Sequence, residues 1–424
     1  MERRVVITGL GVASPIGIGL EDFRTALKEG QSGIRFDQRL ADLQFSCQVS
    51  GTPPVVTEKL THYFTDLELR NFNSTGIMYG VIAGLDAWKD AGLEISEDEI
   101  PDWDSGTVFG TGTSGIEKFR ESIYKIDALQ TRKLGSTAVS QTMNSGISAY
   151  LGGKLGLGNQ VTTNSSACTT GTESILMAFE RIKSGKAKRI LAGSTSDSGP
   201  YIWAGFDAIK VCNFKSNENP EAASRPMSAS AAGFVPGSGA AALVVEDLES
   251  ALARKAKIYC EILGGNSNSG GQRGGGSMTA PNSTAVQKCV KDAILDANIE
   301  AEDIDYISGH LTATSKDSTE IRNLAEALNR FGKDFPYINS LKALTGHCLS
   351  ASGSIEAVAA VLQLAENFVA PNINCEDLNR EITAVIDPEC IPKELIAKEI
   401  NIAAKVSFGF GDVNGCIIFK KYSE

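Results

Sequence analysis

One cysteine stands out by its surroundings. Cys168 lies in TTNSSACTTGTESILMAF (162–179), among Ser, Thr, Ala and Gly, where a helical pattern begins with Ile175, Phe179 and Ile182 on one face. A thiol at a helix start lies beside free N–H groups and the positive end of the helix dipole, which favour the thiolate and can hold an oxyanion. The sequence therefore predicts either thioester chemistry at Cys168 or a cysteine that fills space as a small hydrophobe.

The chain has only three histidines. His310 ends the strand-like DYISGH, and His347 lies between a strand-like and a helical segment, five residues after Lys342. Ligands of α/β proteins gather at the carboxyl ends of strands, so these two histidines and Cys168 suit acyl transfer. His62 lies in a polar helical region and is expected on the surface. No two metal-ligating residues share a short-spaced motif, so no metal site is predicted.

Short apolar runs alternate with helical patterns along the chain. Strand-like runs lie at 3–12, 105–113, 189–196, 240–247, 258–265, 305–310, 335–341 and 403–411, and helical patterns at 75–92, 171–187, 283–299, 318–332 and 353–367. This alternation predicts an α/β fold with mostly parallel sheets. A charged stretch near residue 250 divides the chain into halves 1–250 and 251–424, a pattern consistent with an internal duplication.

The overall composition is that of a globular protein: 42% of the 424 residues are hydrophobic and 21% are charged. A net charge of −11 argues against nucleic-acid binding. The nine cysteines are scattered without a CxxC pair, which excludes a zinc ribbon and indicates a reducing cytoplasm. No apolar run is long enough for a membrane span, and MERRVVITGLGVASPIG is expected to form a strand and a turn rather than a signal peptide.

A glycine-rich segment, GGNSNSGGQRGGGS (264–277), has neither GxxxxGK[ST] nor a correctly placed GxGxxG. We expect a mobile surface loop there rather than a phosphate-binding loop.

Taken together, the motifs of this chain resemble those of the β-ketoacyl-acyl-carrier-protein synthases, the condensing enzymes of fatty acid and polyketide synthesis. The resemblance runs from RRVVITGLGVASPIG to SFGFGDVNGCIIFKK, with NPEAASRPMS, GFVPGSGAAALVVEDLESA, GHLTAT and LKALTGH…SGSIE between them in the family's order. It implies a duplicated thiolase fold with five layers, α/β/α/β/α, and usually a homodimer.

The resemblance also implies roles for single residues. The expected catalytic set is Cys168 as nucleophile, His310 and His347 as the histidine pair, and Lys342 beside them, with Glu356 orienting Lys342. Phe410 matches the gating aromatic residue, whose backbone N–H also contributes to the oxyanion hole. Substrate-binding residues are expected at Thr312, Thr314, Ile116 and Thr279. Carrier-protein docking residues are expected at Arg132, Lys133 and Lys215.

The mechanism implied is a decarboxylative Claisen condensation. Cys168 takes an acyl group from a carrier protein, and the histidine pair stabilises the enolate that malonyl-carrier protein forms when it loses carbon dioxide. The substrates travel on phosphopantetheine, and no other cofactor or metal is implied. Acyl-carrier protein is the expected partner, with a second copy of the chain or a chain-length partner completing a dimer.

Several positions depart from the family pattern. Leu311, Asp412, the pair Glu117 and Lys118, the segment MSASAAG and the glycine-rich loop replace residues common in relatives. They surround the gate and the acyl tunnel, which leads us to expect a specialised elongating synthase of polyketide or aryl-polyene type. One alternative is a non-catalytic chain-length partner, but such partners characteristically lack the cysteine. The other is a thiolase or a starter-type synthase. A thiolase needs a second catalytic cysteine where this chain has GFGDVNG, and a starter-type synthase carries Asn where this chain has His347.

Overall fold

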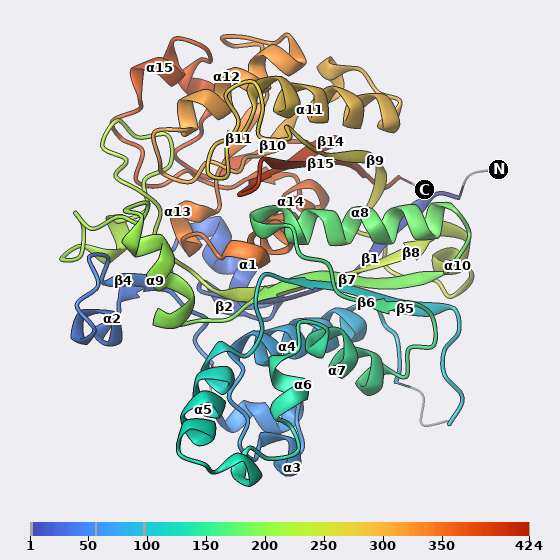
Figure 1. Cartoon of the computed structure of the whole chain (residues 1–424). Coiled ribbons are helices and arrows are strands. Elements are labelled where there is room, and N and C mark those ends of the chain that lie inside the picture. The colour runs from blue at the N-terminus through green and yellow to red at the C-terminus, as the bar shows by residue number, and fades with distance from the viewer. Residues whose placement is uncertain (1–2, 56, 96–98, 424) are drawn as a thin grey trace.

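Five alternating layers of helices and strands build the molecule (Figure 1). The computed structural model describes residues 3–55, 57–95 and 99–423. Two sheets enclose a pair of helices, and each sheet carries further helices on its outer face, as Figure 1 shows. The inner pair is α8 (Thr170–Lys183) and α14 (Ser352–Glu366), and the outer helices are α4 (Thr75–Asp90) and α7 (Gly146–Leu155) on one side and α11 (Ser283–Ala297) and α12 (Asp317–Leu328) on the other. The layers agree with the fold that the sequence predicts.

Both halves of the chain build their sheet with the same strand order. The first half contributes β1 (Val5–Ser14), β5 (Ser105–Thr111), β6 (Val161–Thr162), β7 (Arg189–Ser196) and β8 (Gly239–Asp247) in the order β6-β5-β7-β8-β1. The second contributes β9 (Cys260–Ser269), β10 (Tyr306–Ser308), β11 (Tyr337–Asn339), β14 (Ile402–Gly409) and β15 (Val413–Lys421) in the order β11-β10-β14-β15-β9. Parallel and antiparallel neighbours also correspond, so the fold is an internal duplication. Each half has two parallel and two antiparallel strand pairs, and the halves join antiparallel, so the prediction of mostly parallel sheets is wrong.

The two sheets meet where β1 and β9 pair antiparallel, with Val5 opposite Ile262 and Ile7 opposite Cys260. All ten residues of β1 and all nine of β8 are buried. A strand that is covered on both faces needs apolar or small side chains throughout, which explains the unbroken apolar runs of the sequence.

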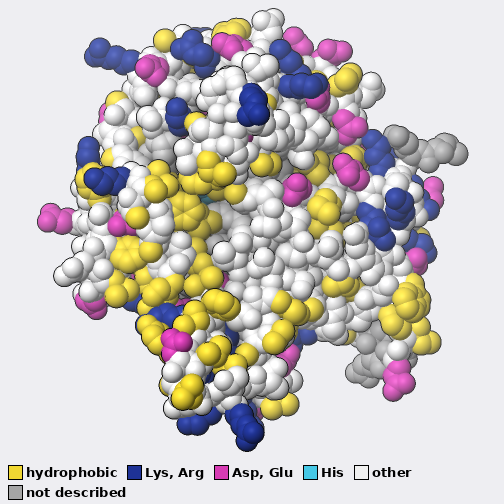
Figure 2. Space-filling view, in the orientation of Figure 1, with side chains coloured by type: hydrophobic (Ala, Val, Ile, Leu, Met, Phe, Trp, Pro, Cys, Tyr) yellow, Lys and Arg dark blue, Asp and Glu magenta, His cyan; other side chains and the backbone are white. Residues whose placement is uncertain are grey.

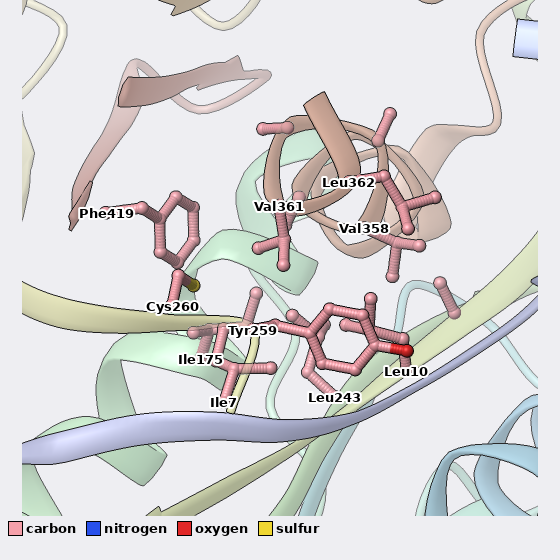
Figure 3. Packing of buried hydrophobic residues seen from close by; sticks show 14 of the residues in the cluster. Ile7, Leu10, Ile175, Leu243, Tyr259, Cys260, Val358, Val361, Leu362 and Phe419 are labelled. Carbon is pink, nitrogen blue, oxygen red and sulfur yellow. The ribbon is translucent and has the colours of Figure 1, made fainter. Parts of the chain in front are cut away.

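The largest core lies between the sheets, around α8 and α14. Figure 3 shows Ile7 and Leu243 from the first sheet, Phe419 from the second, and Ile175 and Val361 from the two inner helices packed together. Thirteen of the fifteen residues of α14 are buried, which explains why its sequence is largely apolar rather than amphipathic.

Glycine allows α8 and α14 to approach each other closely. A Cβ on Gly171 would lie 2.3 Å from Ser354 N, and one on Gly353 would lie 2.5 Å from Thr172 N. Each helix follows a short 3-10 turn, η3 (Ala167–Thr169) or η6 (Leu349–Ala351). The helices thus cross near their N-termini, where Cys168 and His347 lie.

The smaller elements cover the ends of the sheets. They include β2 (Gly17–Ile18), β3 (Ile34–Phe36), β4 (Val49–Gly51), β12 (Phe368–Val369), β13 (Ile396–Ala397), α1 (Leu20–Glu29), α2 (Gln38–Asp42), α3 (Asp66–Leu69), α5 (Ile116–Asp127), α6 (Ala138–Thr142), α9 (Pro200–Ala208), α10 (Leu248–Ala253), α13 (Lys342–Thr345) and α15 (Arg380–Thr383), with the 3-10 turns η1 (Thr57–His62) and η2 (Thr131–Lys133). His62 is exposed, as expected. Within the described ranges, no helix has the length and apolar content that crossing a bilayer requires.

The glycine-rich segment is only partly a loop, which corrects the expectation. Residues 264–269 complete β9 and pair with β15, with Gly265 opposite Ile417 and Ser269 opposite Val413. Only 270–276 form an exposed turn. Here the partner strand overrides the weak strand propensity of glycine.

Candidate active site

A cavity of about 300 Å³ leads to Cys168. His310, His347 and Phe410 line the same cavity, although these residues come from four separate segments of both halves. The side chains of Cys168 and the two histidines are buried apart from the part that faces the cavity. The structure thus brings together the thiol and the imidazole pair that the sequence singled out.

Cys168 lies in the middle of η3, one residue before α8. The backbone N–H groups of Cys168 and Phe410 both interact with the thiol. Two such donors at one point can hold the oxyanion of a tetrahedral intermediate. The Cβ position of Gly409 lies 3.2 Å from Cys168 N, so a larger residue would disturb this contact.

The expectation of a stabilised thiolate is wrong for the resting site. Burial raises the pKa of the Cys168 thiol to about 11, although Lys342 and the N–H of Phe410 oppose the rise. Burial destabilises the thiolate more than the N–H groups at the helix start and the ammonium of Lys342 stabilise it. Cys168 is therefore a thiol near neutral pH, and its proton must leave as the sulfur attacks.

Each histidine carries its proton on Nε2, because Nδ1 faces a group that donates. Leu349 N–H donates to Nδ1 of His347 at 3.2 Å, and Ser352 Oγ lies 2.9 Å from the same atom. Lys342 Nζ lies 3.4 Å from Nδ1 of His310 and has no lone pair to offer when it is an ammonium. With Nδ1 accepting, the neutral ring donates from Nε2.

The imidazole rings lie edge to face, with centroids 5.4 Å apart. Phe408 packs against His310 and Phe234 against His347, at centroid distances of 6.0 and 5.1 Å. Burial, followed by the nearby positive charges, including that of Lys342, holds the pKa of both histidines well below the usual value. Both rings are therefore neutral hydrogen-bond donors.

A charged cluster lies behind the histidines. Lys342 Nζ donates to Glu356 Oε1 and, at 2.6 Å, to the backbone carbonyl of His310. Glu356 also faces a second lysine, Lys405, whose Nζ lies 2.8 Å from Oε2. All three charged side chains are at most 2% exposed. The structure thus places Glu356 where the sequence expects it, and adds Lys405, which the sequence analysis did not single out.

Two buried carboxyl groups shape the loop that carries His310. Glu320 accepts the N–H groups of His310 and Leu311 at 2.6 and 2.8 Å, and Asp317 accepts that of Thr312 at 2.9 Å. Burial, together with the charge of Asp317, raises the pKa of Glu320 to about 8. The sequence analysis did not predict this role. The sequence does contain an indication of it, because the loop after His310 leads into a helix that begins with Asp317 and Glu320.

The proposed substrate-binding threonines lie at the cavity. Thr312 and Thr314 line it with their hydroxyls 3.0 Å apart, and the exposed Thr279 lies at its outer part. Phe410 packs on Phe206, with ring centroids 5.9 Å apart, which suits a gate.

The other predicted residues lie apart from this cavity. Ile116 begins α5, donates its N–H to Asp197 at 3.1 Å, and does not line the cavity. Arg132, Lys133 and Lys215 are exposed. Their roles in acyl binding and docking stay predictions.

Two family models match the chain: the N-terminal domain of β-ketoacyl synthases over residues 2–251 and their C-terminal domain over residues 259–376. Among curated relatives, the chain is 34% identical to 3-oxoacyl-[acyl-carrier-protein] synthase 2 of Vibrio harveyi and 33% identical to 3-oxoacyl-[acyl-carrier-protein] synthase 1 of Escherichia coli K12, each over 100% of both chains.

Solved structures agree with this assignment. A β-ketoacyl synthase from Burkholderia phymatum matches with a TM-score of 0.88 and 28% identity, and the ishigamide ketosynthase/chain length factor with 0.87 and 26%, each over 100% of both chains. The fold is therefore the duplicated thiolase fold of the ketosynthases. The chain belongs to the β-ketoacyl synthase family and is a condensing acyltransferase.

Proposed function

We propose that this enzyme extends an acyl group held on Cys168 by two carbons taken from malonyl-acyl-carrier protein. The observation that carries the proposal is that Cys168, His310 and His347 line one cavity, with both imidazoles donating from Nε2. A nucleophile and two neutral donors at one point suit a reaction that passes through an acyl-enzyme and an enolate.

In the first half-reaction, Cys168 attacks the thioester carbonyl of an acyl-carrier protein. The N–H groups of Cys168 and Phe410 hold the carbonyl oxygen as it becomes negative. The bond from the carbonyl carbon to the pantetheine sulfur then breaks, and the proton of the Cys168 thiol ends on that departing sulfur. Because the thiol pKa is about 11, attack and proton loss must be coupled.

In the second half-reaction, His310 and His347 donate to the thioester carbonyl of malonyl-carrier protein. The bond to the carboxylate breaks, carbon dioxide leaves, and the bonding electrons form an enolate whose oxygen accepts both hydrogen bonds. The enolate carbon attacks the acyl carbonyl, and the bond to Cys168 breaks to give the β-ketoacyl product. The cysteine sulfur then takes a proton from solvent.

The phosphopantetheine arm of the carrier protein supplies the thioester in both steps. Thr312 and Thr314 fit a role in binding its amides, because both line the cavity that leads to Cys168 and carry hydroxyls 3.0 Å apart. Thr279 extends this lining toward the surface. The arm belongs to the substrate, and the proposed mechanism uses no further cofactor.

Exposed side chains support a dimer and a docking surface. Figure 2 shows hydrophobic side chains gathered over α5 and α9, and the exposed ones on or beside α5 include Phe119, Ile123, Tyr124 and Leu129. We infer that this face and the edge strand β6 contact a second copy of the chain. We also infer that Arg132 and Lys133, in the turn after α5, contact the acidic carrier protein.

The nine cysteines are all free thiols, which suits an enzyme of the reducing cytoplasm.

Intact-mass measurement and a carbon dioxide assay test the proposed function together. The purified protein should gain the mass of one acyl group when incubated with acyl-carrier proteins, and Cys168→Ala should not. The acylated enzyme should then release carbon dioxide from malonyl-carrier protein and form a β-ketoacyl product. A protein that neither becomes acylated nor releases carbon dioxide would be a chain-length partner instead.

The choice of acyl chain forms a separate question. The changes around the gate, including Asp412 and Leu311, lead us to propose a specialised acyl substrate of polyketide or aryl-polyene type. A competition among saturated, polyunsaturated and aryl-capped acyl-carrier proteins measures this preference. Equal or better use of the saturated chains would refute the specialisation and leave the condensing activity untouched.

A further inference from the structure

A second lysine is buried at the centre of the molecule without a role in the steps above. Lys405 lies on β14, is 0% exposed, and faces Glu356 Oε2 across 2.8 Å. Its Nζ donates to Val406 O and, at 2.8 Å, to Ser407 Oγ. Ser407 Oγ in turn lies 2.8 Å from Thr172 Oγ1, on the first turn of the helix that follows Cys168.

The other half of the fold shows that this position does not need a lysine. In the second half, Ser407 of β14 contacts Thr172 of α8, and in the first half, Ser194 of β7 contacts Ser354 of α14 at 2.7 Å. Counting two residues back from each serine pairs Lys405 with Ala192, which is fully buried. Because burying an ammonium is unfavourable, the lysine must be retained for something other than packing.

We propose that Lys405 is a positioning residue for the decarboxylation step, and that its ammonium gives the buried cluster with Lys342 and Glu356 a net positive charge behind the histidine pair. The inference rests on the proposed function. Burial lowers the pKa of Lys405, and the charge of Glu356 opposes that fall. With both lysines protonated, two ammonium groups share one carboxylate, so one positive charge is uncompensated within the cluster. That charge stabilises the negative oxygen of the enolate and opposes a proton on either imidazole.

Raised pKa values keep Glu320 and the nearby cysteines, Cys348 included, largely uncharged near neutral pH, whereas Asp317 is ionised. Glu320, on α12, has a pKa raised to about 8 by burial and so is mostly protonated. Cys168 at the start of α8 has a pKa of about 11 and Cys416 on β15 one of about 12, both raised by burial. Asp317, whose pKa burial raises to about 6, accepts four backbone N–H groups and is ionised near neutral pH. Its charge is the same in every variant below, so the differences between variants report Lys405 and Glu356.

The pH dependence of both histidines agrees with a charge of this kind. Burial lowers the pKa of His310 and of His347, and Lys342 and Lys405 lower each further. Because Nδ1 of each ring already accepts from a donor, protonation there breaks a contact with Lys342 or Leu349. Protonation thus removes the contact that orients the ring, and we expect the acid limb of the pH–rate profile to report the pKa at which this contact is lost.

The test measures carbon dioxide release from malonyl-carrier protein as a function of pH. Lys405→Met roughly keeps the length of the side chain and removes the charge that lowers the pKa of both histidines. The acid limb should therefore move up by about one pH unit, the order of magnitude for one nearby unit charge at an effective dielectric constant of about 20. Lys154→Met removes a largely buried lysine on the outer helix α7, which pairs with Glu68, and is the control. Its acid limb should stay where the wild-type limb lies.

A charge-restoring variant separates electrostatics from structure. Lys405→Met combined with Glu356→Gln has the same net charge as the wild-type cluster, so its acid limb should return toward the wild-type position, whereas Glu356→Gln alone should move the limb down. A purely structural role would not produce these opposite shifts. If Lys405→Met does not fold, the difference between Glu356→Gln and the double variant gives the same one-unit shift.

The outcomes distinguish the two proposals. A wild-type enzyme that releases no carbon dioxide refutes the proposed function itself. If the wild-type enzyme releases carbon dioxide but the acid limb does not move when Lys405 is replaced, alone or together with Glu356→Gln, the role of Lys405 alone is refuted.

Discussion

The two halves of the chain place different chemistry on one scaffold. In each half a 3-10 turn begins with a residue of positive φ, Ala167 or Leu349, and leads into an inner helix. Counting from these residues, Cys168 in the first half corresponds to Ser350 in the second, and Ser174 corresponds to Glu356. The first half thus supplies the nucleophile, and the second half supplies the charged and imidazole groups together with one N–H donor, that of Phe410.

This difference explains how a duplicated fold can run a two-step reaction. Acyl transfer needs a sulfur and two N–H donors, whereas decarboxylation needs neutral donors held beside a positive charge. Because α8 and α14 cross at Gly171 and Gly353, the thiol of the first half and the imidazoles of the second half line one cavity. Substitutions in one half should therefore affect one step before the other.

The largest effect is expected from the first half. Cys168→Ala removes the atom that holds the acyl chain, so condensation should fall by at least about 10³-fold. Carbon dioxide release from malonyl-carrier protein should persist, since His310 and His347 are untouched. Radiolabelled carbon dioxide and intact-mass analysis measure both activities, and loss of decarboxylation in this variant would contradict the division between halves.

The mirror-image experiment changes the second half. His310→Ala or His347→Ala should lower decarboxylation by about 10²- to 10³-fold, because each removes one hydrogen bond to the enolate oxygen. Acylation of Cys168 should be slowed much less, which rapid-quench mass spectrometry can follow. Equal losses in both half-reactions would mean that the two steps share their machinery.

The crossing itself can be tested through stability. Gly171→Ala puts a Cβ 2.3 Å from Ser354 N and 2.5 Å from Ser194 Oγ, and should destabilise the fold by about 3 kcal/mol. Gly153→Ala, in α7, meets no atom within 4 Å and should instead stabilise by about 0.5–1 kcal/mol. Denaturant unfolding compares the pair, and a Gly171→Ala protein as stable as the wild type would argue against a close-packed crossing.

The smallest effect is expected at the surface. Arg132→Glu together with Lys133→Glu should raise KM for carrier-protein substrates about tenfold and leave turnover of a free pantetheine thioester unchanged. Lys291→Glu, an exposed lysine on α11 in the second half, serves as the control. If both changes raise KM alike, carrier recognition depends on overall charge rather than on the first half.

The sequence predicted the layers, the strands and the meeting of Cys168 with His310 and His347, because each of these depends on local pattern or motif. It did not reveal Lys405, which sits inside the apolar run AAKVSFGFG and is recognisable only once Glu356 lies opposite. The raised pKa of Cys168 also escaped it, since burial depends on loops distant in sequence. The common strand order of the two halves became visible only in the structure, because corresponding strands have the same neighbours but different sequences.

Burial gives the nine cysteines unequal access to reagents. All are free and buried, but Cys168 alone among them lines the catalytic cavity. An electrophile that must first seat a carbonyl against the N–H groups of Cys168 and Phe410 would react there and leave the other sulfurs unmodified. We therefore expect selective covalent inhibition at Cys168. Binding of the inhibitor in the cavity, rather than the acidity of the thiol, determines which cysteine reacts.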